Sequence, residues 1–288
     1  MTKITQNPVF IGIFSFLIVL FTMPLGHVLM ILMEHYLPES TLYYSAFTMG
    51  GIGLLLALFG MFRNEDTRQT LYGLFGGLLF WTGWVEFLYV YYAHRFGVEP
   101  LIVNGEVVTK PEYLIMPSSF GFWVMFMVIY IFSIRSGCDF FNYLQRKLFK
   151  SSRQKIIASP IVRNASITTF MEINLILWTS YLLLLFCYDD NFIGDDNFIV
   201  ILIAIASLIG SLYMFRRLIK IRHWGRSIRY SIANVIVFWT FVEIMGRLNI
   251  MKEIWIDPLG HSTEILVIFG AFLIVMIIPI TLYLIKKR

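Results

Sequence analysis

Histidine and glutamate side chains that could do chemistry occur in and beside the long apolar segments of this sequence. An ionisable group inside a bilayer is costly, and the groups found there usually serve a function. The residues concerned are His27, Glu34, His35, Glu86, His94, Glu243, His261 and Glu264. Imidazole and carboxylate groups together bind iron, copper or zinc, so this set contains a candidate transition-metal site.

Helical spacing determines which of these groups share a face. His27 and Glu34 lie about two helical turns apart, so they point the same way. His261 and Glu264 lie about one turn apart and are adjacent on a helix. We therefore expect the metal ligands to be His27, Glu34, His35, His94, His261 and Glu264. The alternative is that the histidines contact water and lipid head groups, because no pair has the Glu-x-x-His spacing of bundle metal sites.

Glu86 is the carboxylate best suited to proton transfer, and it is our first catalytic candidate. It has no basic residue within one helical turn and it follows Trp81 in an apolar segment. A desolvated carboxyl group is costly to ionise, which suits it to carrying a proton. Glu243 is the second catalytic candidate, although Arg247 lies one turn further on and could form an ion pair with it.

The composition indicates an integral membrane protein. The 288 residues are 58% hydrophobic and 14% charged, whereas a soluble domain is about 45–50% apolar and about 25% charged. Continuous apolar runs of this length predict transmembrane helices and disfavour a β-barrel, whose strands alternate. The runs cover residues 9–33, 42–62, 70–93, 118–135, 165–187, 197–216, 229–247 and 263–285. We expect an all-α bundle of eight spans that forms a single integral membrane domain over residues 1–288.

The basic residues predict the orientation of these spans. They concentrate in three regions, 136–164, 217–228 and 286–288, and eight spans place all three regions on one side. Basic loops stay in the cytoplasm, so we expect both chain ends there, in the cytoplasmic (inner) membrane of a bacterium. The segment 136–164 mixes apolar and basic residues, which favours contact with anionic lipid head groups.

A short pattern occurs in both halves of the chain. Met-Phe-Arg is followed by Phe-Trp-Thr and then by a glutamate, at 61–63, 80–82 and Glu86, and again at 214–216, 238–240 and Glu243. A repeat of four spans preserves the orientation of the next copy, so this pattern predicts a parallel 4+4 repeat. The alternative is a coincidence in a chain of biased composition.

Three further patterns concern packing and covalent structure. Asn104-Gly105 lies between apolar residues, which is typical of a hairpin turn and predicts a small β-ribbon. Glycines that favour close helix packing concentrate in the second and third runs, at Gly50, Gly51, Gly53, Gly73, Gly76 and Gly77. Cys138 and Cys187 are expected on opposite sides of the membrane and therefore unpaired.

Three functions are consistent with these features. The first is a metal-dependent membrane oxidoreductase with an outward-facing His/Glu site, an iron, copper or zinc cofactor, and a lipophilic or periplasmic substrate. The second is a secondary transporter or proton-coupled carrier that uses Glu86 and Glu243. The third is a non-catalytic subunit of a membrane complex, and a homo-oligomer is compatible with each function. No nucleic-acid partner is expected, and the sequence has no phosphate-binding glycine loop, serine-nucleophile motif or ATP-binding signature.

Overall fold

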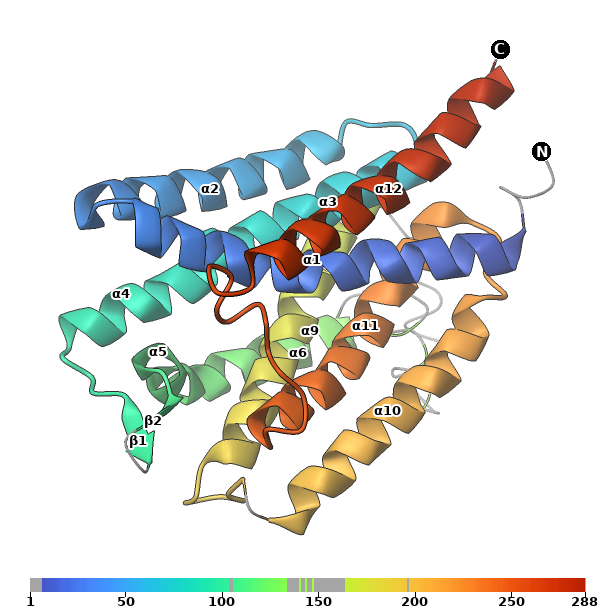
Figure 1. Ribbon diagram of the computed structural model, residues 1–288. Coiled ribbons are helices and arrows are strands. Elements are labelled where there is room, and N and C mark those ends of the chain that lie inside the picture. Colours follow the sequence, from blue (N-terminus) through green and yellow to red (C-terminus); the bar gives the residue numbers. More distant parts are fainter. Residues whose placement is uncertain are drawn as a thin grey trace. The chain divides into compact units, whose positions relative to one another are not determined.

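The computed structural model describes residues 7–103, 106–133, 140, 143, 147, 164–195 and 197–287, and this part is almost entirely helical (Figure 1). The first half contains α1 (Pro8–Tyr36), α2 (Glu39–Gly60), α3 (Asp66–Phe80), a π-helical turn η1 (Trp81–Glu86), α4 (Phe87–Arg95), α5 (Pro111–Ile115), a 3-10 turn η2 (Met116–Ser119) and α6 (Phe120–Ser133). The second half contains α9 (Ala165–Tyr188), α10 (Phe198–Leu218), α11 (Trp224–Arg247) and α12 (Ser262–Lys287).

Eight helical segments within the described residues are long and apolar enough to cross a membrane. They fit a multi-pass integral membrane protein, as the apolar runs predicted, and most of their ends agree with the prediction to within a few residues. The fourth segment is the exception, because it starts at Pro111 instead of the predicted residue 118. Pro111 and Pro117 lie in the first positions of α5 and η2, where proline is well tolerated, so two short turns precede α6.

The connection from α4 to α5 contains a short ribbon. β1 (Leu101–Val103) pairs antiparallel with β2 (Glu106–Thr109), which confirms the predicted ribbon, while the turn residues 104–105 lie outside the described residues. The predicted lipid-binding segment 136–164, with Cys138, also lies outside them, apart from Phe140, Tyr143, Lys147 and Asn164. Cys187 is buried and forms no disulfide.

Close contacts divide the chain into two compact units. Unit 1 comprises residues 1–42 and 201–288, and unit 2 comprises residues 43–200. Unit 1 therefore contains α1, α11, α12 and most of α10, while unit 2 contains α3 to α6, α9 and most of α2. The single domain, the cytoplasmic chain ends and the 4+4 repeat stay predictions.

Glycines allow the helices of unit 2 to approach one another closely. α3 packs along α9, and a Cβ on Gly73 would overlap the carbonyl oxygen of Ser166. α2 approaches α3 in the same way, because a Cβ on Gly53 would lie 2.6 Å from the carbonyl oxygen of Gly76. The close packing that the glycines predicted is confirmed at these positions.

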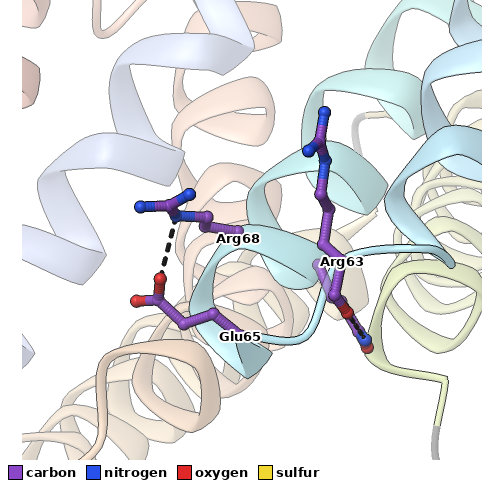
Figure 2. A network of polar contacts seen from close by, with 4 residues as sticks. Arg63, Glu65 and Arg68 are labelled. Atoms are coloured by element: carbon purple, nitrogen blue, oxygen red, sulfur yellow. Dashed lines mark hydrogen bonds and ion pairs between the residues drawn. The ribbon is translucent and has the colours of Figure 1, made fainter.

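One side chain connects the turn between α2 and α3 to the start of α9. Gln69 donates its amide to the carbonyl oxygen of Arg63 and accepts a hydrogen bond of 2.9 Å from the backbone N–H of Ala165. Figure 2 shows this turn, with an ion pair of 2.8 Å between Arg68 and Glu65 beside it. The first N–H groups of a helix have no partner within the helix, so Gln69 supplies one for α9.

In unit 1, α1 packs along α11 and α12. Gly12 lets α1 approach the end of α10, since a Cβ there would lie 2.8 Å from the Cα of Ile219. Phe16 of α1 contacts Phe215 and Phe238 edge to face. Towards the other end of α1, a buried cluster joins α1, α11, α12 and the loop between the last two, and it consists of Val28, Val242, Trp255 and Ile265.

The spans differ in how much of their surface other protein residues cover. Half of the most apolar part of α9 is buried and 67% of that of α11, whereas the corresponding share for α12 is 11%. The side chains that α12 leaves exposed are apolar, for example Leu266 and Val267. Lipid is the natural contact for such a face, because water would have to hydrate an extended apolar surface.

Candidate functional site

Glu86 is the last residue of the π-helical turn η1, within the third of the segments that are long and apolar enough to cross a membrane. Its side chain is 7% exposed, so its expected desolvation is confirmed. π-Turns are rare within α-helices and occur frequently at functional sites. The charges that act on its carboxyl group are those of Glu112 and Lys110. The chain therefore folds back after the ribbon and brings a second carboxyl group and an ammonium group towards Glu86.

Two tryptophans of η1 determine the surroundings of Glu86. Trp84 packs against Gly50 of α2, where any Cβ would overlap the indole ring. Its Nε1 donates a hydrogen bond of 2.9 Å to the carbonyl oxygen of Phe47. Trp81 contacts Tyr181 of α9, with ring centroids 5.4 Å apart. Helices α2 and α9 thus both hold η1 and fix the place of its glutamate.

The segment that carries Glu112 is also anchored to α9. Tyr113 of α5 stacks on Tyr181 with a centroid distance of 6.0 Å. The indole N–H of Trp178 donates a hydrogen bond of 2.9 Å to the hydroxyl of Ser119 in η2. Because Trp81 and Tyr113 both contact the same tyrosine, α9 is the common support of Glu86 and Glu112.

Glu243 lies near the end of α11 and has two hydrogen-bonding neighbours. The indole N–H of Trp239 donates to its Oε1 at 2.7 Å, and Glu253 in the following loop forms a side-chain hydrogen bond with it. An ionised carboxylate only accepts hydrogen bonds, so a bond between two carboxyl groups requires a proton on one of them.

Glu253 reaches Glu243 because the loop after α11 turns back over Gly246. A Cβ on Gly246 would lie 2.5 Å from Oε1 of Glu253, so a larger residue would displace this carboxyl group. Burial raises the pKa of Glu253 above its ordinary value of 4.5, although the hydrogen bond to Glu243 and the charge of Arg247 act in the opposite direction. Glu253 consequently keeps a proton at a higher pH than an exposed glutamate does.

The histidines are distributed over both units. His27 and His261 are half-buried residues of unit 1, where Glu34, His35 and Glu264 are exposed, and His94 is exposed in unit 2. His261 Nδ1 lies 3.7 Å from Oε1 of Glu264, so the predicted adjacency of this pair is confirmed.

No three His, Cys, Asp or Glu side chains of the described residues lie close enough together to hold a metal ion. The structure therefore adds no support for the predicted metal ligands, and the metal site stays a prediction. The roles assigned to Glu86 and Glu243 stay predictions as well.

Sequence reasoning did not identify several of the charged residues that the fold places in the interior or beside the two glutamates. Arg229 of α11 is 2% exposed. Arg229 lay at the edge of the predicted span, and only the longer helix places it inside. Glu112 and Glu253 gave no signal, because they approach the candidate glutamates through the folding back of loops.

Comparison with known protein families, with curated proteins and with solved structures gives no match for this chain. Function therefore has to be inferred from the chemistry of the two glutamates and their neighbours.

Proposed function

We propose that this protein is a proton-coupled membrane carrier in which Glu86 and Glu243 bind and release protons. The observation that carries the proposal is the pairing of each glutamate with a second carboxyl group. Glu86 interacts with Glu112, and Glu243 is hydrogen-bonded to Glu253. Like charges disfavour each other's ionisation, which suits each glutamate to carrying a proton.

The position of the glutamates supports the same function. Both lie within membrane-spanning segments, where an ionisable side chain marks an ion or proton pathway. Glu86 is almost completely buried, and a buried carboxyl group can gain or lose its proton only when a path to water opens. Coupling requires this property, because a carboxyl group open to both sides at once would leak protons.

The test is proton flux into proteoliposomes that contain a pH-sensitive dye. A pH gradient is imposed, and amino acids, dipeptides, sugars, sodium and potassium are added separately as the probes. We expect one probe class to drive proton movement, and Glu86→Gln and Glu243→Gln to lower its rate about 100-fold, because an amide cannot carry the proton. Glu99→Gln, at an exposed residue of the outer connection, is the matched control and should leave the rate unchanged.

Two results would contradict the carrier. One is a flux that never exceeds that of protein-free vesicles with any of these probes. The other is a robust flux that is insensitive to both glutamine substitutions in protein that remains monodisperse after purification.

The metal-dependent oxidoreductase is the second candidate, and the observation that favours it is the His261–Glu264 pair. An imidazole and a carboxylate at this distance are two of the ligands that zinc or iron needs. Elemental analysis of the purified protein tests this candidate. About one bound iron, copper or zinc ion per chain that is lost in His261→Ala would support it, and protein without bound metal would remove it.

A further inference from the structure

The two units are built by the same pattern of helix packing. In unit 2, α3 and α6 both pack on α9. In unit 1, α11 and α12 both pack on α1. α3 and α6 belong to the third and fourth spans and α9 is the fifth, while α11 and α12 are the seventh and eighth spans and α1 is the first. If the chain consisted of two four-span copies, each unit would therefore contain the later helices of one copy and the first helix of the other.

The two first helices carry matching residues. α1 begins after Asn7, whose side chain accepts a hydrogen bond of 2.9 Å from the N–H of Val9. α9 begins after Asn164, whose side chain caps its first turn in the same manner. Further along, the hydroxyl groups of Thr22 in α1 and Thr179 in α9 both donate a hydrogen bond to a backbone carbonyl oxygen of the preceding helical turn. The residue numbers of the two asparagines and of the two threonines differ by the same amount.

The residue numbers of Glu86 and Glu243 also differ by that amount, whereas those of Phe80 and Phe238, at the start of the motif, differ by one more. The first copy reads Phe80-Trp-Thr-Gly-Trp-Val-Glu86 and the second reads Phe238-Trp-Thr-Phe-Val-Glu243, so the first contains one more residue. The extra residue coincides with the π-helical turn Trp81–Glu86, whereas α11 is a continuous α-helix. A π-turn takes up one residue by widening the helix locally, so the helix beyond it keeps its face.

We propose that the chain consists of two copies of a four-helix repeat that exchange their first helices, and that Glu86–Glu112 and Glu243–Glu253 are equivalent carboxyl pairs. Glu112 lies in α5, at the start of the segment that contains the last helix of the first copy, and Glu253 lies in the loop just before the last helix of the second copy. A basic residue accompanies each pair, Lys110 in unit 2 and Arg247 in unit 1. This assignment rests on the proposed function only for the role of the pairs as proton sites.

The register of the two motif helices gives a test that does not depend on transport. Two cysteine pairs report the register, in protein that also carries Cys138→Ser and Cys187→Ala. Tyr43→Cys with Phe87→Cys probes the helix beyond η1, because these two rings lie 5.6 Å apart. Val28→Cys with Val242→Cys probes the end of α11, because both residues belong to one buried cluster. A short thiol-specific cross-linker measures each pair.

Deletion of Gly83 and deletion of Phe241 are then compared. Gly83 is the extra residue, so its deletion should convert the π-turn to regular helix and keep the cross-linking yield at positions 43 and 87 within about twofold. Deletion of Phe241 removes a residue from a regular helix, which rotates the following part by about 100°, and it should abolish cross-linking at positions 28 and 242. Insertion of a glycine after Thr240 copies the first motif and should preserve that cross-link.

Loss of the cross-link at positions 43 and 87 on deletion of Gly83, in monodisperse protein, overturns the proposal. So does failure to fold of both the Gly83 deletion and the Thr240 insertion. The pairs are tested in the proteoliposome assay, where Glu112→Gln and Glu253→Gln should each slow proton flux about tenfold. If only Glu112→Gln and Glu253→Gln leave the proton flux unchanged, the equivalence of the two pairs is refuted. If all four glutamine variants leave the flux unchanged while the cross-links form as expected, the carrier is refuted and the repeat is retained.

Discussion

The two candidate glutamates lie in different surroundings although the same motif precedes both. Glu86 is almost fully buried in a π-turn, and the nearby indole N–H of Trp84 is directed to the backbone of α2. Glu243 is half-buried at the end of a regular helix, and the indole N–H of Trp239 is directed to its own carboxyl group. The N–H group of Trp84 therefore connects two helices of unit 2, whereas that of Trp239 holds the candidate glutamate of unit 1.

Because of this difference, substitutions near Glu86 and near Glu243 should change different measured properties. In unit 2 a change near Glu86 should first affect helix packing, because glycines and indoles fill the space between α2, α3 and α9. In unit 1 a change near Glu243 should first affect the protonation of the carboxyl pair.

The largest effect is expected for Gly73→Ala in unit 2. The added methyl group would overlap the carbonyl oxygen of Ser166, and such overpacking costs about 3 kcal/mol of unfolding free energy. Gly270→Ala in unit 1 is the matched control, because a Cβ there meets nothing within 4 Å. Denaturation in mild detergent measures both variants. Equal stability of the two would show that α3 and α9 are not held at this distance.

The next effect distinguishes the two indoles. Trp239→Phe removes a hydrogen bond to a carboxyl group and should cost about 1.5 kcal/mol, while Trp84→Phe removes one to a carbonyl group and should cost about 1 kcal/mol. Only Trp239→Phe should also change proton flux in proteoliposomes. A flux that responds equally to both substitutions would remove the contrast between the units.

The pH dependence of stability should show a smaller effect in unit 1. Burial raises the pKa of Glu253 above 4.5, so the folded protein binds this proton more tightly than the unfolded chain. The stabilisation is complete at a pH below the unfolded value and is lost as the pH rises through the folded pKa. As the pH rises from about 4 towards neutrality, the unfolding temperature of Glu253→Gln should therefore fall less than that of the parent protein. An identical decline in both proteins would contradict the burial of this carboxyl group.

The smallest effect is expected at the turn between α2 and α3 shown in Figure 2. Arg68→Ala breaks an exposed ion pair with Glu65 and should cost about 0.3 kcal/mol. Gln69→Ala removes the acceptor for the Ala165 N–H and should cost about 1 kcal/mol. The same denaturation measurement compares the two variants. A larger loss of unfolding free energy for Arg68→Ala than for Gln69→Ala would show that the ion pair contributes more to stability than the hydrogen bond to Ala165.

The sequence alone predicted the eight helices and the burial of Glu86 well. Continuous apolar runs report directly on the cost of exposing a polar backbone to lipid, so the helices and most of their ends followed from composition. The recurrence of Phe-Trp-Thr with a glutamate pointed to Glu86 and Glu243 as comparable residues.

Other features depend on contacts between distant segments and could not be predicted in this way. The early start of the fourth helix at Pro111 depends on short turns whose residues are not continuously apolar. Glu112 and Glu253 approach their partners because loops fold back over a helix, and no local pattern records that path. The π-turn is visible in the sequence only as one extra residue once the two motifs are aligned.

The packing of α1 on α11 and α12 also has a consequence for the order of biosynthesis. α1 leaves the ribosome first, but its partner helices are the last to be made, whereas the described helices that lie wholly in unit 2 have all been synthesised by the end of α9. A nascent chain whose residues up to Val200 have entered the membrane would therefore hold a complete unit 2 and a first helix without its partners α11 and α12. During that interval α1 is stable in lipid without its partner helices because its sequence is strongly apolar. α11 carries the buried Arg229, and it enters a bilayer in which its partner α1 is already present.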